Sequence, residues 1–224
     1  MKVAVVMFPG SSGADDVAYI YKKVFGADSY IVWHQEETIG KPDLLVIPGG
    51  AAFGDYLRPG ALTLSSPIVG AIRKFSRDGG PTIGIGNGFQ ILCELHILPG
   101  ILLPNIGMQF INREVFLLVQ NNQTPFTKNY KEEDVIKLPM ACSYGRYFAD
   151  KRTIRDLEEN GEIVFRFCDK EGEIDDKEPF NGCINSIAAI CSRHKNTVGM
   201  ICHPERACEE IMQNTEGMKI LGII

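Results

Sequence analysis

Apolar runs of strand length alternate with segments of helical apolar spacing over the first hundred residues. Residues 2–8 (KVAVVMF) form a continuous apolar run that ends at Pro9 and Gly10, as expected of a strand buried on both faces. In 14–24 the apolar residues recur with a helical period and predict a helix that packs on a sheet. Further strands at 30–34, 43–50 and 81–85 and a helix at 67–76 continue the alternation. The pattern predicts a parallel sheet with right-handed crossovers and helices on both faces.

The second half of the chain is richer in strand patterns. Strands are expected at 109–121, 134–141, 162–169, 186–192 and 197–203. Two polar and charged segments, 121–134 and 169–182, are interpreted as solvated loops or hairpin ends. The chain has 224 residues, of which 45% are hydrophobic, and no linker or repeat divides it. We therefore expect one domain that spans residues 1–224.

Composition and cysteine spacing argue against several classes of function. The 23 basic and 28 acidic residues include no basic run interleaved with aromatics, so no nucleic-acid partner is expected. The N-terminal apolar run is too short for a signal-peptide core or a membrane span, which favours a cytoplasmic protein without a membrane partner. The seven cysteines contain no C-x-x-C pair, so we expect free buried thiols and no metal site.

Ligands of open parallel α/β sheets bind beyond the carboxyl ends of the strands. In this chain those ends carry Pro9-Gly10, Pro48-Gly49-Gly50 and the segment Gly84–Gly88. These three glycine-rich turns are therefore the places where a site is expected.

The Gly84–Gly88 segment (GIGNG) has two interpretations. As a dinucleotide-binding fingerprint it fails, because Phe89 stands where a third small residue is needed and no acidic residue follows about twenty positions later. A nucleophile elbow fits better, since a strand, a sharp turn and a helix with small flanking residues follow one another. The residue at the elbow, however, is Gly86, which has no reactive atom but tolerates a positive φ.

The motif HPER follows the last predicted strand and contains His203 and Glu205. In extended backbone, residues two apart project to the same side, so Glu205 could orient the His203 imidazole toward a substrate. An ordinary structural histidine remains an alternative for this short motif.

The segment 48–61 (PGGAAFGDYLRPGA) places several glycines beside Asp55 and Arg58. It is either a turn with unusual backbone angles or a set of backbone N–H groups that form an oxyanion hole after the third strand. The order of these motifs along the chain is more specific than any one of them.

Taken in order, the motifs resemble the class I glutamine amidotransferases over essentially the whole chain. The matching segments read FPGSS, PGGAAFGDYLRPGA, SPI, GIGNGFQILCE, LLPN, GRYFAD, FNGCINSIAAIC and GMICHPERA. Within that family the resemblance is to glutaminase subunits of purine biosynthesis. It implies a flavodoxin-like parallel sheet with helices on both sides and an antiparallel β extension.

The resemblance also implies an activity. In the family a cysteine thiolate attacks the side-chain amide of glutamine, a thioester forms, and water releases glutamate. The ammonia passes to a large ATP-dependent synthetase subunit, and a small third subunit often bridges the two. ATP and magnesium belong to the synthetase, so no cofactor is expected in this chain.

Carried over by position, the family's site falls on residues of this chain. His203 would be the general base and acid, and Glu205 would orient it. The N–H groups at Gly50 and around the elbow would stabilise an oxyanion, and Gln90 would hold the amino-acid end of the substrate. The expected substrate-binding residues are Gly49, Gly50, Asn87, Gln90, Ser143 and Tyr144.

This chain departs from the family pattern at several positions. Gly86 stands where the family has its nucleophilic cysteine. Residues 141–147 read ACSYGRY where the family usually has AHGEGRY, and Ser12 and Gly13 replace the usual Asn and Cys. Cys93 lies two helical turns beyond the elbow, roughly 10 Å along the axis, which is too far to replace the nucleophile. Cys142, in the altered loop, is an alternative thiol.

Two functions remain open on this basis. The chain is a glutaminase subunit with residual or rescued activity, or it is a non-catalytic structural or regulatory partner whose synthetase uses free ammonia. An unrelated nucleotide-binding module is disfavoured by the failed fingerprint.

Overall fold

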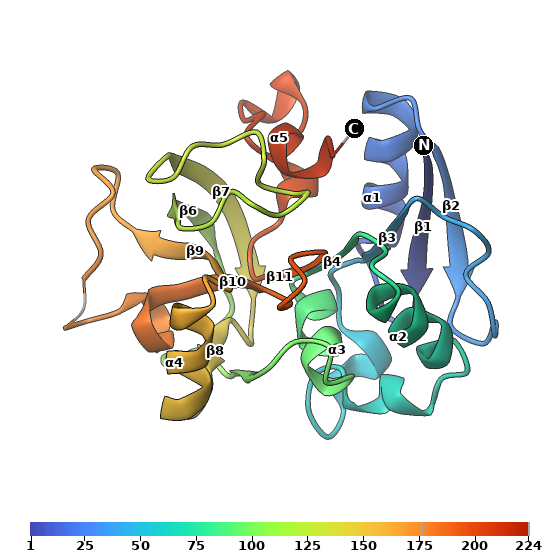
Figure 1. Ribbon diagram of the computed structural model, residues 1–224, viewed down its shortest axis with the longest axis horizontal. Helices are drawn as coiled ribbons and strands as arrows, with labels where there is room; N and C mark the ends of the chain where they lie inside the picture. Colours follow the sequence, from blue (N-terminus) through green and yellow to red (C-terminus); the bar gives the residue numbers. More distant parts are fainter. Residues whose placement is uncertain (176, 224) are drawn as a thin grey trace.

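The computed structural model describes residues 1–175 and 177–223, and a twisted sheet runs through their centre (Figure 1). Its strand order is β2-β1-β3-β4-β11-β10-β9-β6-β7. The strands are β1 (Lys2–Met7), β2 (Asp28–Trp33), β3 (Leu44–Ile47), β4 (Thr82–Ile85), β6 (Ile111–Val119), β7 (Val135–Cys142), β9 (Ile163–Cys168), β10 (Ile187–Cys191) and β11 (Thr197–Met200). A separate antiparallel pair joins β5 (Ile101–Leu103) to β8 (Arg146–Phe148).

The first five strands of this order are parallel. β1 pairs with β2 and β3, β3 pairs with β4, and β4 pairs with β11, each time in the parallel sense. Every residue of β3, β4 and β11 is buried, which explains why their sequences are apolar without alternation. The order 2-1-3-4 with a fifth strand at its side is that of flavodoxin-like folds, so the expected fold class is confirmed.

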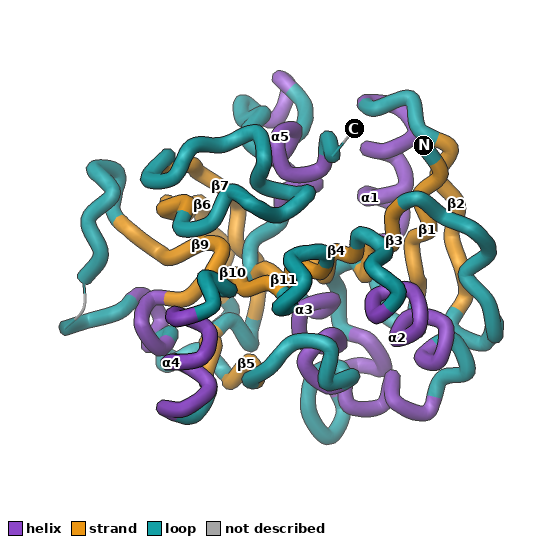
Figure 2. Tube along the Cα trace, viewed as in Figure 1, coloured by secondary structure: helices purple, strands orange, loops and turns teal. Residues whose placement is uncertain are grey.

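Helices cover both faces of the parallel half (Figure 2). Those on the parallel half include α1 (Ala14–Tyr19), which continues as a π-helix (Ile20–Val24), α2 (Val69–Arg77) and α3 (Asn87–Glu94). Helix α4 (Lys151–Glu159) lies beside the antiparallel strands, and α5 (Gly217–Leu221) packs on the turn at 204–206 (Figure 1). The crossovers from β1 to β2 and from β3 to β4 run in opposite directions along the sheet, so right-handed connections place α1 and α2 on opposite faces. α3 packs against β3, β4 and β11, at the centre of the sheet.

The antiparallel extension expected from the family resemblance is also present. β10 pairs antiparallel with β11 and β9, and β6 pairs antiparallel with β9 and β7. The extension therefore continues the main sheet through β11. Because β11 also pairs with β4, it links the extension directly to the strand that precedes Gly86.

One loop prediction is wrong in part. Segment 121–134 connects β6 and β7 as a hairpin end, but it is not a solvated loop, since Phe126 and Tyr130 are buried. The hydroxyl groups of Thr124 and Thr127 lie 2.7 Å apart and hydrogen-bond to each other, so this polar stretch can be buried. Segment 169–182 is mostly exposed, as expected, although its residue 176 lies outside the described residues, as does residue 224 of the predicted domain. Among the described residues, no helix is long and apolar enough to cross a membrane.

Candidate active site

The loops that follow β1 and β3 meet at one edge of the sheet. The N–H of Ala51 donates to the carbonyl oxygen of Gly10 at 2.8 Å, and the N–H of Gly13 donates to that of Gly49 at 3.1 Å. A Cβ on Gly50 would lie 2.4 Å from the Gly10 oxygen, so the approach requires glycine. Two of the three glycine-rich turns predicted from the sequence are thus in direct contact.

The third turn, between β4 and α3, has the geometry of a nucleophile elbow. Gly86 has a φ of 53° and a ψ of −109°, a conformation that residues with a side chain rarely adopt. α3 begins at the next residue and packs closely on the sheet, since a Cβ on Gly88 would lie 1.9 Å from the carbonyl oxygen of Ile47. The strand, sharp turn and helix follow one another as the sequence predicts.

His203 and Glu205 form a buried pair. The Nδ1 of His203 donates to Oε1 of Glu205 at 2.7 Å, and the two residues are only 3% and 4% exposed. The backbone route differs from the prediction, because Pro204–Arg206 forms a 3₁₀ turn and not an extended segment. The backbone N–H of His203 donates to the carbonyl oxygen of Pro139 on β7 at 2.8 Å, which fixes the backbone of His203 relative to the antiparallel extension.

The free edge of this imidazole faces the elbow. A Cβ placed on Gly86 would lie 3.1 Å from Cε1 and 3.2 Å from Nε2 of His203. Nε2 itself lies 3.3 Å from the carbonyl oxygen of Ala141. A thiol or hydroxyl on residue 86 would therefore be adjacent to a ring nitrogen whose partner nitrogen is held by a carboxylate, which is the arrangement that activates a nucleophile.

A cavity of about 140 Å³ lies between the elbow and the loop after β7. Its wall is formed by Gly50, Ala51, Asp55, Gly86, Asn87, Gln90, Phe110, Ala141, Cys142, Ser143, Tyr144 and His203. The cavity thus brings together all the predicted site residues except Gly49 and Glu205, which lie behind the imidazole. A Cβ on Gly49 would be 2.7 Å from Cε1 of His203, so the backbone of Gly49 packs directly against the imidazole ring.

Two buried amides hold the cavity walls in place. The Asn87 oxygen accepts from the N–H of Ala52 at 2.9 Å, and its nitrogen donates to Gln90 Oε1 at 2.6 Å and to Asp55 Oδ1 at 3.2 Å. The Gln90 nitrogen donates to the carbonyl oxygen of Tyr144 at 2.9 Å. Asn87 and Gln90 therefore join the β3 loop, the elbow helix and the loop after β7 into one wall.

Backbone N–H groups are available at the same place. In the described part of the chain the N–H of Gly50 donates to no backbone or side-chain acceptor. At the start of α3, Phe89 is the first residue whose N–H donates back to Gly86, so the N–H groups of Asn87 and Gly88 precede the intrahelical ladder. Such donors suit an anionic oxygen that develops beside residue 86.

The family model described as the CobB/CobQ-like glutamine amidotransferase domain matches residues 1–220. This chain belongs to that glutamine amidotransferase family. The finding agrees with the elbow, the histidine–glutamate pair and the cavity, and it confirms the family resemblance found in the sequence.

Relatives of this glutamine amidotransferase are similar over nearly their full length. The phosphoribosylformylglycinamidine synthase subunit PurQ of Rhodopseudomonas palustris is 47% identical over 218 residues, which are 97% of this chain and 94% of the relative. The subunit of the same name from Aquifex aeolicus is 43% identical over 220 residues, with coverage of 98% and 97%. A chain in the structure of PurLQS from Thermotoga maritima superposes with a TM-score of 0.86 at 34% identity, covering 100% of this chain and 96% of that one.

The thiols near the cavity have raised pKa values. Cys142 lines the cavity, but burial raises the pKa of its thiol to about 12. Its Sγ is 4.0 Å from Asn105 Oδ1. Burial also raises the pKa of Cys93, whose Sγ faces the carbonyl oxygen of Pro99 at 3.7 Å. Neither thiol has the lowered pKa or the helix N-terminus that activates a cysteine.

Sequence reasoning did not assign Asp55, Phe110 and Ala141 to the cavity wall. The sequence places Asp55 beside the glycines of its loop but indicates no role for it. Phe110 comes from the loop before β6, and no local pattern relates it to residues 86 or 203, because the contact depends on how the extension folds back over the sheet. Among the described residues, no group of three or more His, Cys, Asp or Glu side chains could hold a metal ion.

Proposed function

We propose that this chain is the glutamine-binding subunit of a phosphoribosylformylglycinamidine synthase in purine biosynthesis. The proposal is supported by the PurQ relatives, which match nearly the whole chain at 43% and 47% identity. It is also supported by a cavity of amino-acid size that contains the elbow, the imidazole and free backbone donors. Glutamine would enter with its side-chain amide between Gly86 and His203.

The residues of the cavity would divide the work of amide hydrolysis. The N–H groups of Gly50 and of the first turn of α3 would stabilise the oxyanion formed from the amide oxygen. His203, held by Glu205, would accept a proton from the attacking group and return one to the departing ammonia. The attacking group on residue 86 is absent, so water would have to attack the carbonyl carbon directly, and the rate would fall by orders of magnitude.

The proposal rests most on where a side chain at residue 86 would point. A Cβ on this residue would lie 3.2 Å from Nε2 of His203, in contact with the imidazole and facing the cavity. We propose that Gly86 occupies the position of the family's cysteine and that the chain itself hydrolyses glutamine negligibly. The cavity would retain its shape for substrate binding and for contact with a synthetase.

The wider assignment follows from the same proposal. The chain, as one domain over 1–224, would assemble in the cytoplasm with a large synthetase subunit and, in some assemblies, a small bridging subunit. ATP and magnesium would act on the synthetase, and this chain would need no cofactor of its own.

A second function is favoured by the same glycine. A chain without a nucleophile, whose nearest alternative thiol has its pKa raised to about 12, could serve as a structural or regulatory partner of a synthetase that uses free ammonia. Its cavity would then bind glutamine without hydrolysing it.

The two functions are separated by an assembly assay. The chain and its synthetase are co-purified, and amidine formation is measured with either glutamine or ammonium chloride as the nitrogen source. We expect both the original chain and Gly86→Cys to form a stable complex that uses ammonium. Only the complex with Gly86→Cys is expected to use glutamine. Equal use of glutamine by the original chain would contradict the absence of turnover, and failure to form a complex would contradict the subunit assignment.

A further inference from the structure

The cavity wall has one acidic side chain, Asp55, and no lysine or arginine. One carboxylate oxygen of Asp55, Oδ1, accepts from Asn87 Nδ2 at 3.2 Å. Among the described residues, no donor reaches the other oxygen, Oδ2. A free carboxylate oxygen on the wall of an otherwise neutral cavity calls for a cationic or hydrogen-bond-donating group on the ligand.

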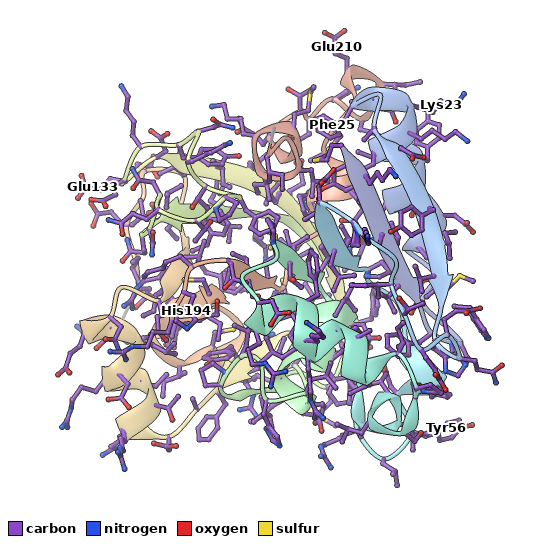
Figure 3. The ribbon with its side chains drawn as sticks, turned by 45° about the vertical axis from the view of Figure 1, so that its right-hand side comes forward. Lys23, Phe25, Tyr56, Glu133, His194 and Glu210 are labelled. Carbon is purple, nitrogen blue, oxygen red and sulfur yellow. The ribbon has the colours of Figure 1, made fainter. Side chains whose placement is uncertain are left out.

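The carboxylate is held in this position by its loop. Phe53, Gly54 and Asp55 all have positive φ values, of 54°, 69° and 56°, so the chain turns back sharply after β3. The turn is anchored by the N–H of Phe53, which donates to Pro9 at 2.6 Å, and by the N–H of Ala52, which donates to Asn87. The next side chain, Tyr56, is 74% exposed and projects from the molecule (Figure 3).

Among the described residues, no lysine or arginine forms an ion pair with this carboxylate. The closest basic residue along the loop, Arg58, is paired with both oxygens of Glu94 at 2.6 Å through its Nε and Nη2 atoms. Burial raises the pKa of Asp55, and the hydrogen bond from Asn87 opposes that rise. A ligand cation would therefore supply the partner that the protein does not.

Asn87 also relates Asp55 to the reaction centre. Asn87 directly follows Gly86, and its side chain reaches Asp55, so the carboxylate and the elbow lie on the same wall of the cavity. A ligand whose amide lies at the elbow would extend toward Asp55 with its other end. In glutamine that other end carries the α-ammonium group.

We propose that Asp55 binds the α-ammonium group of the substrate and so selects free amino acids over amides that lack this group. The inference rests on the proposed function, because it takes glutamine to be the ligand. It assigns specificity to a residue outside the catalytic histidine–glutamate pair.

The test measures equilibrium binding by calorimetry in the original chain, in which Gly86 prevents covalent turnover. The two ligands are L-glutamine and glutaramic acid, which is glutamine without its α-amino group. We expect the original chain to prefer glutamine by about tenfold to hundredfold, as for a charge-assisted hydrogen bond. In Asp55→Asn, glutamine affinity is expected to fall by that factor while glutaramate affinity is nearly unchanged.

Two controls keep the outcome specific. Glu37→Gln removes an exposed charge away from the cavity and is expected to leave both affinities unchanged. The preference of the original chain for glutamine over glutaramate requires no variant at all, so the test holds even if Asp55→Asn folds poorly.

The outcomes separate the two proposals. If glutamine binds but is not preferred over glutaramate, or if Asp55→Asn keeps the preference, the role of Asp55 is refuted while glutamine binding stands. If neither ligand binds the original chain, the proposed function fails and the inference fails with it.

Discussion

Gly86 and His203 face each other across an empty side-chain position. A Cβ on Gly86 would lie 3.2 Å from Nε2 of His203, and Glu205 holds the opposite ring nitrogen at 2.7 Å. His203 and Glu205 thus have the geometry of the histidine and acid in a nucleophile–histidine–acid arrangement, and we propose that residue 86 is the position of the nucleophile.

Glu205 should matter only once a nucleophile is present. In the Gly86→Cys background, Glu205→Gln is expected to lower kcat for glutamate release by about a hundredfold or more, because the imidazole loses the carboxylate that orients it and stabilises its protonated form. The matched control is Glu210→Gln, an exposed residue at the periphery of the molecule (Figure 3), which should leave kcat unchanged. Equal kcat values for all three proteins would argue against the proposed role of Glu205.

Two glycine-to-alanine substitutions should change stability in opposite directions. Gly88→Ala places a Cβ 1.9 Å from the carbonyl oxygen of Ile47, and is expected to lower the free energy of unfolding by about 1–3 kcal/mol or more. Gly70→Ala, at an exposed position of α2 with no atom within 4 Å of the new Cβ, should raise it by about 0.4–1 kcal/mol. Urea unfolding of both variants gives the comparison. A tolerated Gly88→Ala would mean that α3 does not pack on β3 as described.

Cys142 should be unreactive although it lines the cavity. With a pKa of about 12, its thiolate fraction at pH 8 is about one in ten thousand. Alkylation by iodoacetamide at pH 8, followed by peptide mass spectrometry, should modify Cys168 first, because its pKa is raised only to about 11 and its side chain is partly exposed, whereas Cys191, with a similar pKa, is buried. Cys142→Ser should not alter glutamate release by the Gly86→Cys variant. Rapid alkylation of Cys142 would restore it as a candidate nucleophile.

The parallel half of the fold was predictable because its signals are local. Strands such as Leu44–Ile47 are buried on both faces, so their apolar runs identify them without knowledge of the rest of the chain. Helix α4 also has a local signal in the sequence, since Asp150 caps it by accepting from the N–H groups of Arg152 and Thr153.

The remaining features depend on contacts between distant segments. The pairing of His203 with Glu205 was expected, but through extended backbone, whereas Pro204 starts a 3₁₀ turn that brings the two side chains together. Asp55 and Phe110 share a cavity only because the loop after β3 and the loop before β6 meet beside the elbow. No periodicity along the chain indicates that these two loops meet, so the residues that line the cavity could be identified only from the structure.

The most direct measurement is glutamate release from glutamine by the chain in complex with its synthetase, compared among the original, Gly86→Cys and Gly86→Ala. Both variants add a Cβ at a positive φ and should lose about 1–3 kcal/mol of stability, so Gly86→Ala controls for strain. We expect no glutamate release from the original chain or from Gly86→Ala, and release from Gly86→Cys. Turnover by the original chain near the rate of Gly86→Cys would contradict this expectation.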